Sequence, residues 1–231
     1  MHLKIAPKVK LPPKAIIIAH PLDVSLFLKR VKIKSKYNLP LSKLYSSERL
    51  SLVGPCLGGP QVMLIVEYLK AFGIKEILFF GWCSGLQPKI KIGDIVLADA
   101  ATKGRGVFRS DRASISMIIS TLEKGNLPYH IGTVYSTDNP YAETEAKLKK
   151  LKERGILAMD MESADFLRIS NLKSIFANVL LLVSDRFVDG NWEVGFKDAN
   201  FKASKKATID TLLNCIMPTE EKNRKKKFGL H

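Results

Sequence analysis

Two acidic residues on either side of a methionine could bind a sugar. Asp160 and Glu162 flank Met161 where a short apolar segment is expected to pass into a helix. On an extended segment, residues two positions apart point to the same side, so both carboxylates would face one way. A carboxylate there can accept hydrogen bonds from both hydroxyls of a vicinal diol such as a ribose. Alternatively, the two acids complement the positive end of the following helix, and the residues alone leave both interpretations open.

A serine and an aspartate follow the most apolar segment of the chain. Residues 179–183 read VLLLV, and Ser184 and Asp185 come directly after them. An acid at the exit of a buried strand is expected to lose hydration, which raises the pKa of its carboxyl group. Such a group can donate a proton to a leaving nitrogen near neutral pH. The alternative is an Asx turn or helix cap that closes the strand.

The segments around these residues predict strands that alternate with helices. Strands are expected over residues 15–19, 76–80, 94–99, 130–135, 156–159 and 177–183, and helices over 61–72, 113–124, 142–154, 162–169 and 199–216. Such alternation is typical of a mixed, largely parallel central sheet flanked by helices. We therefore predict a single α/β domain over residues 15–217, with a basic arm over 1–14 and a basic tail over 218–231. In sheets of this kind, ligands bind at the carboxyl ends of the strands, where both acidic motifs lie.

The composition excludes several classes of protein. The 231 residues are 46% hydrophobic and 26% charged, which suits a folded core and argues against disorder or low complexity. No segment approaches the ~20 apolar residues of a membrane span, and the N-terminal sequence has no apolar signal-peptide core. The three cysteines are scattered without metal-like spacing, which is typical of reduced thiols. We therefore expect a cytoplasmic protein with no metal site and no membrane span.

The net charge of +15 is concentrated in three segments. Residues 1–14 carry a net +4, residues 29–36 (KRVKIKSK) carry +5, and residues 221–231 (EKNRKKKFGLH) carry +4. Basic segments of this kind can bind nucleic acid or another anionic surface. The alternative, which we favour here, is a solvated lysine-rich surface, because charge runs are usually solvated. Aromatic residues for base stacking stand only at the ends of these runs, at Tyr37 and Phe228.

Five motifs in order resemble the nucleoside phosphorylase/nucleosidase superfamily. They are GPCLGGPQVM at 54–63, EILFFGWCSGLQPKIKIGDIVLADAA at 76–101, YSTDNPY at 135–141, GILAMDMESA at 155–164 and LLVSDRF at 181–187. The resemblance extends over roughly residues 15–215. That superfamily includes purine nucleoside phosphorylases, uridine phosphorylases and methylthioadenosine/S-adenosylhomocysteine nucleosidases. It implies cleavage of the N-glycosidic bond of a nucleoside, with no cofactor except phosphate as co-substrate in a phosphorolytic enzyme.

The resemblance also implies roles for the two acidic motifs. Glu162 would hold the ribose 2′- and 3′-hydroxyls while Met161 packs on the sugar face. Asp185 would protonate, or hydrogen-bond, N7 of a purine, with Ser184 orienting it. Asp160 takes the first acidic place of the family's E-M-E sequence, one methylene shorter.

Further residues match positions of the family that contact the substrate. Tyr141, or Pro140 beside it, falls where the family places an aromatic ring against the base, and Leu57 falls near a ribose-side methionine. The glutamine and arginine expected after Tyr141 in uridine-specific members are absent (AETEAKLK), which disfavours a pyrimidine. Because family sites are commonly completed by a neighbouring subunit, the resemblance also implies a homo-oligomer, a dimer or larger.

The phosphate site of the family is not reproduced in this sequence. Phe79 stands at an arginine position, and Trp82 stands at the Ser/Thr position, with Ser84 nearby. The first loop reads His-Pro-Leu-Asp at 20–23, so the acid Asp23 replaces a further arginine. Burying phosphate beside an acid without an arginine is costly, which favours hydrolysis over phosphorolysis. Lys29, Arg30 or a basic residue of a neighbouring subunit could substitute.

Two interpretations of this altered loop stay open. Nucleosidases of the superfamily activate water with a carboxylate near the first loop, and Asp23 could take that part. Asp23 could instead cap a helix that begins near Val24. A further alternative is a catalytically inactive nucleoside-binding homologue, in which Phe79 and Trp82 fill the space of the nucleophile.

Overall fold

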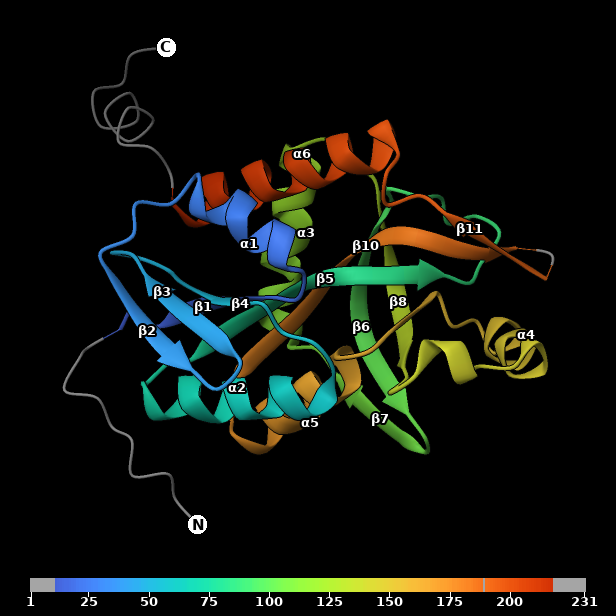
Figure 1. Cartoon of the computed structure of the whole chain (residues 1–231), viewed down its shortest axis with the longest axis horizontal. Helices are drawn as coiled ribbons and strands as arrows, with labels where there is room; N and C mark the ends of the chain where they lie inside the picture. Colours follow the sequence, from blue (N-terminus) through green and yellow to red (C-terminus); the bar gives the residue numbers. More distant parts are fainter. Residues whose placement is uncertain (1–10, 189, 218–231) are drawn as a thin grey trace.

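The computed structural model describes residues 11–188 and 190–217, which form an 11-stranded sheet covered by helices (Figure 1). The strands are β1 (Lys14–Ile18), β2 (Ser35–Leu39), β3 (Ser42–Ser46), β4 (Ser51–Gly54), β5 (Glu76–Gly85), β6 (Ile95–Lys103), β7 (Gly106–Arg109), β8 (Tyr129–Ser136), β9 (Ala158–Asp160), β10 (Phe176–Val188) and β11 (Asn191–Val194). The helices are α1 (Pro21–Leu28), α2 (Gly59–Ala71), α3 (Arg112–Lys124), α4 (Glu145–Glu153), α5 (Ser163–Leu172) and α6 (Ala199–Ile216), with a 3₁₀ turn η1 (Pro140–Ala142). The predicted single α/β domain is confirmed. The predicted basic arm and tail lie largely outside the described residues.

Five strands of the sheet close into a ring. β5 pairs with β9, β9 with β8 and β8 with β6, and β10 then bridges β6 back to β5. From β5 the sheet continues outward through β1, β4, β3 and β2. Pairing is parallel in the centre, between β10, β5, β1 and β4. The carboxyl ends of these central strands therefore lie together at the same edge of the sheet.

Helices cover both faces of the sheet, which explains the unbroken apolar runs of the central strands. Apolar side chains of α2 and α5 pack in one buried cluster, and those of α1, α3 and α6 pack in a second cluster on the other face (Figure 1). No helix within residues 11–188 and 190–217 is long and apolar enough to cross a membrane.

Several elements differ from the sequence prediction. β10 continues to Val188, so Ser184 and Asp185 lie within a strand and not after it, and the turn or cap predicted as their alternative is wrong. The strand continues because β5 and β11 supply hydrogen-bonding partners along its polar end. The strands β2, β3 and β4 had no counterpart in the prediction. Helix α1 begins at Pro21, earlier than the expected Val24.

Candidate active site

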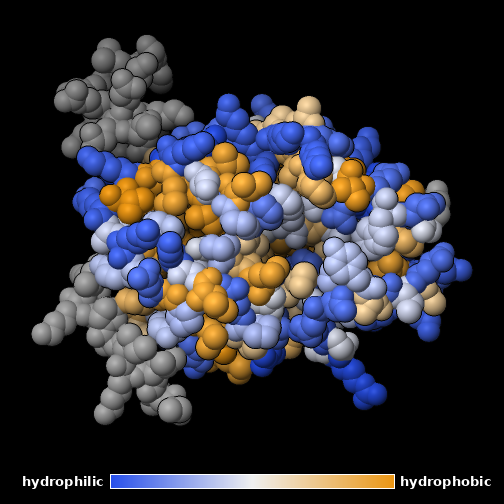
Figure 2. Space-filling model, viewed as in Figure 1, coloured by the Kyte–Doolittle hydropathy of each residue, from blue (hydrophilic) through white to orange (hydrophobic). Residues whose placement is uncertain are grey.

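A pocket of about 470 Å³ lies where β1, β5, β9 and β10 present their polar ends. It corresponds to the hollow near the centre of the face shown in Figure 2. The pocket is lined by Ala19, His20, Pro21, Pro55, Cys56, Leu57, Trp82, Cys83, Ser84, Pro140, Met159, Asp160, Met161, Glu162, Ser184 and Asp185. Both acidic motifs of the sequence thus meet in one pocket, and the closed ring of strands brings them there.

Asp160 is fixed by hydrogen bonds at the start of α5. Ser136 Oγ donates to its Oδ1 at 2.5 Å, and the backbone N–H of Ser163 donates to its Oδ2 at 2.9 Å. The Ser163 hydroxyl also donates to Oδ2. The interpretation of an acid that stabilises the helix N-terminus therefore fits Asp160, although its side chain also borders the pocket.

Glu162 is placed differently from Asp160. It occupies the position before α5, but its side chain makes no capping bond to that helix. Instead, its Oε1 accepts the backbone N–H of Gly58 at 2.6 Å, just before α2. Gly58 has φ +81°, a conformation that residues with a side chain rarely adopt, so a glycine is needed to aim this N–H at the carboxylate. The backbone N–H of Met161 also contributes a hydrogen bond to the carboxylate, and the Glu162 side chain borders the pocket.

Burial dominates the electrostatics of the two acids. Loss of hydration raises the pKa of Glu162 to about 8, and repulsion from Asp160 adds to the effect, while the Gly58 N–H opposes it. Burial also raises the pKa of Asp160, against its hydrogen bonds from Ser136 and Ser163. The electrostatics of the pocket therefore favour the protonated form of Glu162.

This shift makes stability depend on pH. Because the folded protein binds the Glu162 proton more tightly than the unfolded chain does, the free energy of unfolding should fall as pH rises from about 5 to about 8. Glu162→Gln keeps an acceptor for Gly58 but cannot ionise, so its decline over this range should be smaller. Urea unfolding of both proteins at several pH values measures the difference. Parallel curves would show that Glu162 does not titrate in this range.

Asp185 lies at an irregularity of β10 and accepts two hydroxyl donors. The register between β10 and β5 shifts between Val183 and Asp185. Ser84 Oγ, from β5, donates to Asp185 Oδ2 at 2.6 Å, and Ser184 Oγ donates to Oδ1 at 2.6 Å. Bulges often redirect a side chain beside an active site, and here the aspartate reaches the pocket.

His20 forms part of the wall, although the sequence analysis did not select it. Its ring stacks on Trp82 with centroids 3.9 Å apart and planes 10° apart. Its Nδ1 accepts the backbone N–H of Leu22 at 3.2 Å, so His20 caps α1. Burial lowers the pKa of His20, Asp23 opposes the shift and Lys205 adds to it. The imidazole is therefore neutral at pH 7 and carries its proton on Nε2. In the sequence, a histidine directly before Pro21 at the end of a predicted strand could have indicated that His20 lies in the pocket.

Asp23 is fully buried and does not line the pocket. Trp82 Nε1–H donates to its Oδ2 at 2.6 Å, and Lys205 Nζ lies 2.9 Å from its Oδ1. The Lys205 ammonium also lies 4.7 Å from the centroid of the Trp82 ring. Because His20 is the cap of α1, the prediction that Asp23 caps this helix is wrong. The structure gives Asp23 a neutralising ion pair with Lys205 and a positioning hydrogen bond from Trp82, and Asp23 does not line the pocket.

Some of the remaining residues predicted from the sequence line the pocket, and others do not. Leu57 lines the rim of the pocket, although its side chain is 72% exposed. Of the alternatives at the base position, Pro140 lines the pocket, whereas Tyr141 is 98% exposed and does not. Phe79 packs in the core against Phe166, so it does not occupy space in the pocket.

Lysine and arginine are absent from the described lining of the pocket. Of the predicted substitutes, Arg30 is bound to Asp210 and to the carbonyl of Leu26, and Lys29 is exposed on the surface. Within the described residues there is also no group of three or more His, Cys, Asp or Glu side chains that could hold a metal ion.

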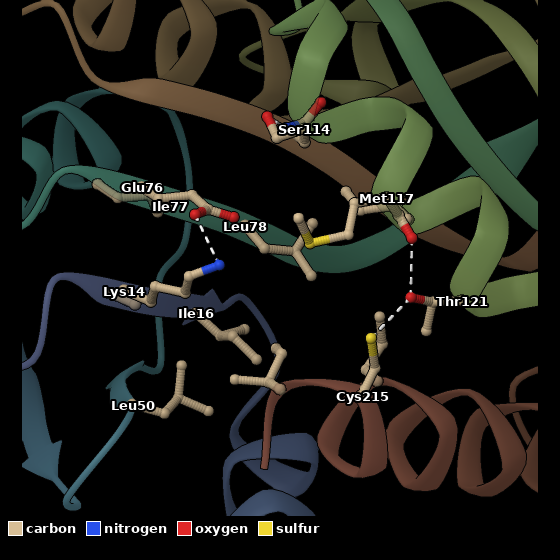
Figure 3. Close-up of a pocket in the computed structure, with 15 residues that line it drawn as sticks. Lys14, Ile16, Leu50, Glu76, Ile77, Leu78, Ser114, Met117, Thr121 and Cys215 are labelled. Carbon is tan, nitrogen blue, oxygen red and sulfur yellow. Dashed lines mark hydrogen bonds and ion pairs between the residues drawn. The ribbon is translucent and has the colours of Figure 1, made fainter. Parts of the chain in front are cut away.

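A second cavity lies at the opposite end of β1 and β5 (Figure 3). It is bordered by apolar side chains such as Leu78 and Met117, and by an ion pair between Lys14 and Glu76 at 2.9 Å. Its volume of about 50 Å³ is much too small for a nucleoside.

Comparisons with solved structures support the fold. The nucleosidase for 5′-methylthioadenosine/S-adenosylhomocysteine of Campylobacter jejuni has a TM-score of 0.78 at 17% identity, covering 88% of this chain and 98% of that one. Uridine phosphorylase of Vibrio fischeri has a TM-score of 0.74 at 17% identity, covering 90% and 93%.

Sequence comparisons identify the family. The chain is 27% identical to a DeoD-type purine nucleoside phosphorylase of Colwellia psychrerythraea, over 73% of this chain and 78% of the relative. It is 23% identical to a guanosine phosphorylase of Halorubrum lacusprofundi, over 75% of this chain and 76% of the relative. The model of the phosphorylase superfamily matches residues 14–216. With its fold and its pocket, this match shows that the chain belongs to the phosphorylase superfamily of nucleoside phosphorylases and nucleosidases.

Proposed function

We propose that this protein cleaves the N-glycosidic bond of a purine nucleoside, by hydrolysis. The observation that carries the proposal is the convergence of Glu162, Met161 and Asp185 in one pocket. The pocket has room for a nucleoside. In it, Glu162 would suit the ribose diol, Met161 the sugar face and Asp185 the base.

Breaking this bond requires two kinds of stabilisation. Positive charge develops on the ribose ring and negative charge develops on the departing base. Asp185 would deliver a proton to the base nitrogen, with Ser84 and Ser184 holding its two oxygens in place. Ribose hydroxyls that donate to Glu162 would favour its ionised form, which places a negative charge beside the sugar as positive charge develops there.

The charges of the pocket support hydrolysis over phosphorolysis. Its described lining includes three carboxyl groups and no lysine or arginine, and His20 is neutral at pH 7. Phosphate carries nearly two negative charges at this pH, so its transfer into such a site without a cation would be costly. Water is uncharged and carries no such penalty.

A comparison of base release with and without phosphate tests the reaction type. Protein freed of phosphate by dialysis should release the base from inosine or adenosine at a rate that added phosphate does not raise. The sugar product should be free ribose. Strict dependence on phosphate, with ribose 1-phosphate as the product, would contradict hydrolysis and indicate that a cation from outside the described lining completes the site.

The burial of Asp23 favours one alternative, a nucleoside-binding protein without catalysis. The carboxylate that resembles the water activator of nucleosidases lies behind Trp82 and is paired with Lys205. Calorimetric binding of a purine nucleoside without any release of base would support this alternative.

The homo-oligomer expected from the resemblance stays a prediction. Gln61 Nε2 donates to the carbonyls of Leu41 and Pro55, which brings the β2–β3 turn beside the rim of the pocket. Leu41 and Leu57 are exposed there, at 84% and 72%. A second copy of the chain would cover these apolar side chains.

A further inference from the structure

One lysine of α6 is buried inside the protein. Lys205 is 7% exposed, and its Nζ lies 2.9 Å from Oδ1 of the fully buried Asp23 on α1, the helix beside α6 (Figure 1). A lysine is rarely buried unless it is paired, because its charge loses hydration. Replacing a buried ion pair by apolar side chains often leaves a fold as stable as before, or more stable. Stability alone is therefore a poor explanation for an ion pair at this place.

The ion pair is connected to the nucleoside pocket by Trp82. The Trp82 Nε1–H donates to the other oxygen of Asp23, Oδ2, at 2.6 Å. A hydrogen bond to an ionised acceptor is stronger than one between neutral groups. The Lys205 ammonium also lies 4.7 Å from the centroid of the Trp82 ring, within the range of cation–π attraction. Trp82 lines the pocket, whereas Asp23 and Lys205 do not.

Trp82 in turn holds a flat wall of the pocket. The His20 ring stacks on the indole, with centroids 3.9 Å apart, and His20 also lines the pocket. Along β5, Trp82 stands two residues before Ser84, which donates to Asp185 at 2.6 Å. Residues two positions apart on a strand point to the same side. A shift of the indole would therefore change the space beside the proposed acid.

We propose that Lys205 is a positioning residue of the pocket, because it holds the ionised Asp23 beside the indole of Trp82. The His20 ring, stacked on that indole, is held with it. One wall of the pocket is thereby fixed before a substrate enters, so binding does not have to order it. The nucleoside as ligand rests on the proposed function, whereas the control of Trp82 by Lys205 does not.

Fluorescence of Trp82 tests the proposal without a substrate. The chain has two tryptophans, and Trp192→Phe leaves Trp82 as the one emitter. In that background, Lys205→Met leaves the buried Asp23 carboxylate without its cation, which is costly, so Asp23 should turn toward water and release the indole. We expect a red-shifted emission and stronger quenching by acrylamide than in the parent protein. Unchanged emission and quenching would overturn the proposal.

Steady-state kinetics measures the consequence for the pocket. Lys205→Met should raise KM for a purine nucleoside about tenfold and lower kcat by less, because Asp185 and Glu162 keep their own contacts. A fall in kcat with KM unchanged would overturn the proposal. If the wild-type protein turns over no nucleoside, the proposed function fails, whereas the fluorescence measurement still decides the role of Lys205.

A double variant distinguishes positioning from packing. Lys205→Met with Asp23→Asn removes both charges, while the asparagine oxygen can still accept the Trp82 N–H. Quenching and KM should return toward the values of the parent protein, because no buried charge is left unpaired. A double variant as impaired as Lys205→Met would overturn the proposal in favour of a packing role. Should Lys205→Met fail to fold, recovery of the fold in the double variant supports the proposal, and no recovery overturns it.

A matched variant on the same helix controls for net charge. Lys206 is next to Lys205 on α6 but is exposed. Lys206→Met removes the same charge and should leave emission, quenching and KM unchanged. An equal effect of the two substitutions would contradict the proposal, since it would show a general effect of net charge. Urea unfolding of each variant establishes that the measurements are made on folded protein.

Discussion

Replacing Asp185 by asparagine is expected to lower the rate of base release by about 10²-fold or more, while the fold survives. Asparagine has nearly the same shape as aspartate, and its side-chain oxygen can still accept a hydrogen bond from the hydroxyl of Ser84 or Ser184. It can donate a hydrogen bond to the base nitrogen but cannot deliver a proton to it. Single-turnover measurements of base release from a purine nucleoside would give the size of the effect.

A neighbouring variant separates proton delivery from positioning. Ser84→Ala removes one of the two hydroxyls that hold the Asp185 carboxyl group, yet leaves the acid itself in place. It should cost much less activity than Asp185→Asn. Near-normal turnover in Asp185→Asn would remove this residue from the proposed mechanism and leave it as part of the β10–β5 pairing.

Replacing Glu162 by alanine is expected to lower kcat/KM by about 10²-fold or more. Two ribose hydroxyls would lose a charged acceptor, and hydrogen bonds to charged groups are worth ~1.5–3 kcal/mol each. Since ~1.4 kcal/mol corresponds to a factor of ten, even the lower end of that range gives the expected loss. Steady-state kinetics with a purine nucleoside measures it.

Stability must be measured beside activity for this variant. Alanine leaves the Gly58 N–H without its acceptor, which destabilises the start of α2. Glu162→Gln preserves that acceptor and should also lose activity, because a neutral amide does not place a charge beside the sugar. A folded Glu162→Ala protein with wild-type kinetics would refute the assignment of Glu162 to the ribose.

The sequence predicted the central strands and both acidic motifs because buried parallel strands and their polar ends leave strong local patterns. The 179–183 run and the DMES sequence were sufficient to place Asp185 and Glu162 near a common site. The strand β2 was missed because alternating lysines over residues 32–36 resemble a charged surface run as much as an edge strand. The strand β4 was missed because its four residues, Ser51–Gly54, are too few to show a clear pattern.

The network behind the pocket wall could not be predicted in the same way. Asp23 lies on α1, Trp82 on β5 and Lys205 on α6, three elements that are far apart in the sequence and meet only in the folded protein. One local signal was present, since Lys205 stands four residues after Phe201 and before Ile209, on the buried stripe of α6. The exposure of Tyr141 likewise depends on how η1 lies over the pocket, which local sequence does not encode.

The ring of strands has a consequence for the order of folding. β5, β9, β8 and β6 form an open row until β10 joins its two ends, and β10 reaches residue 188 of a 231-residue chain. The pairing of β10 with β5 joins segments about a hundred residues apart, and such long-range contacts form slowly. During synthesis, a ribosome must therefore have released the chain as far as β10 before Ser84 can meet Asp185. The pocket is absent from every shorter nascent chain, so a ligand cannot assist folding before β10 has emerged.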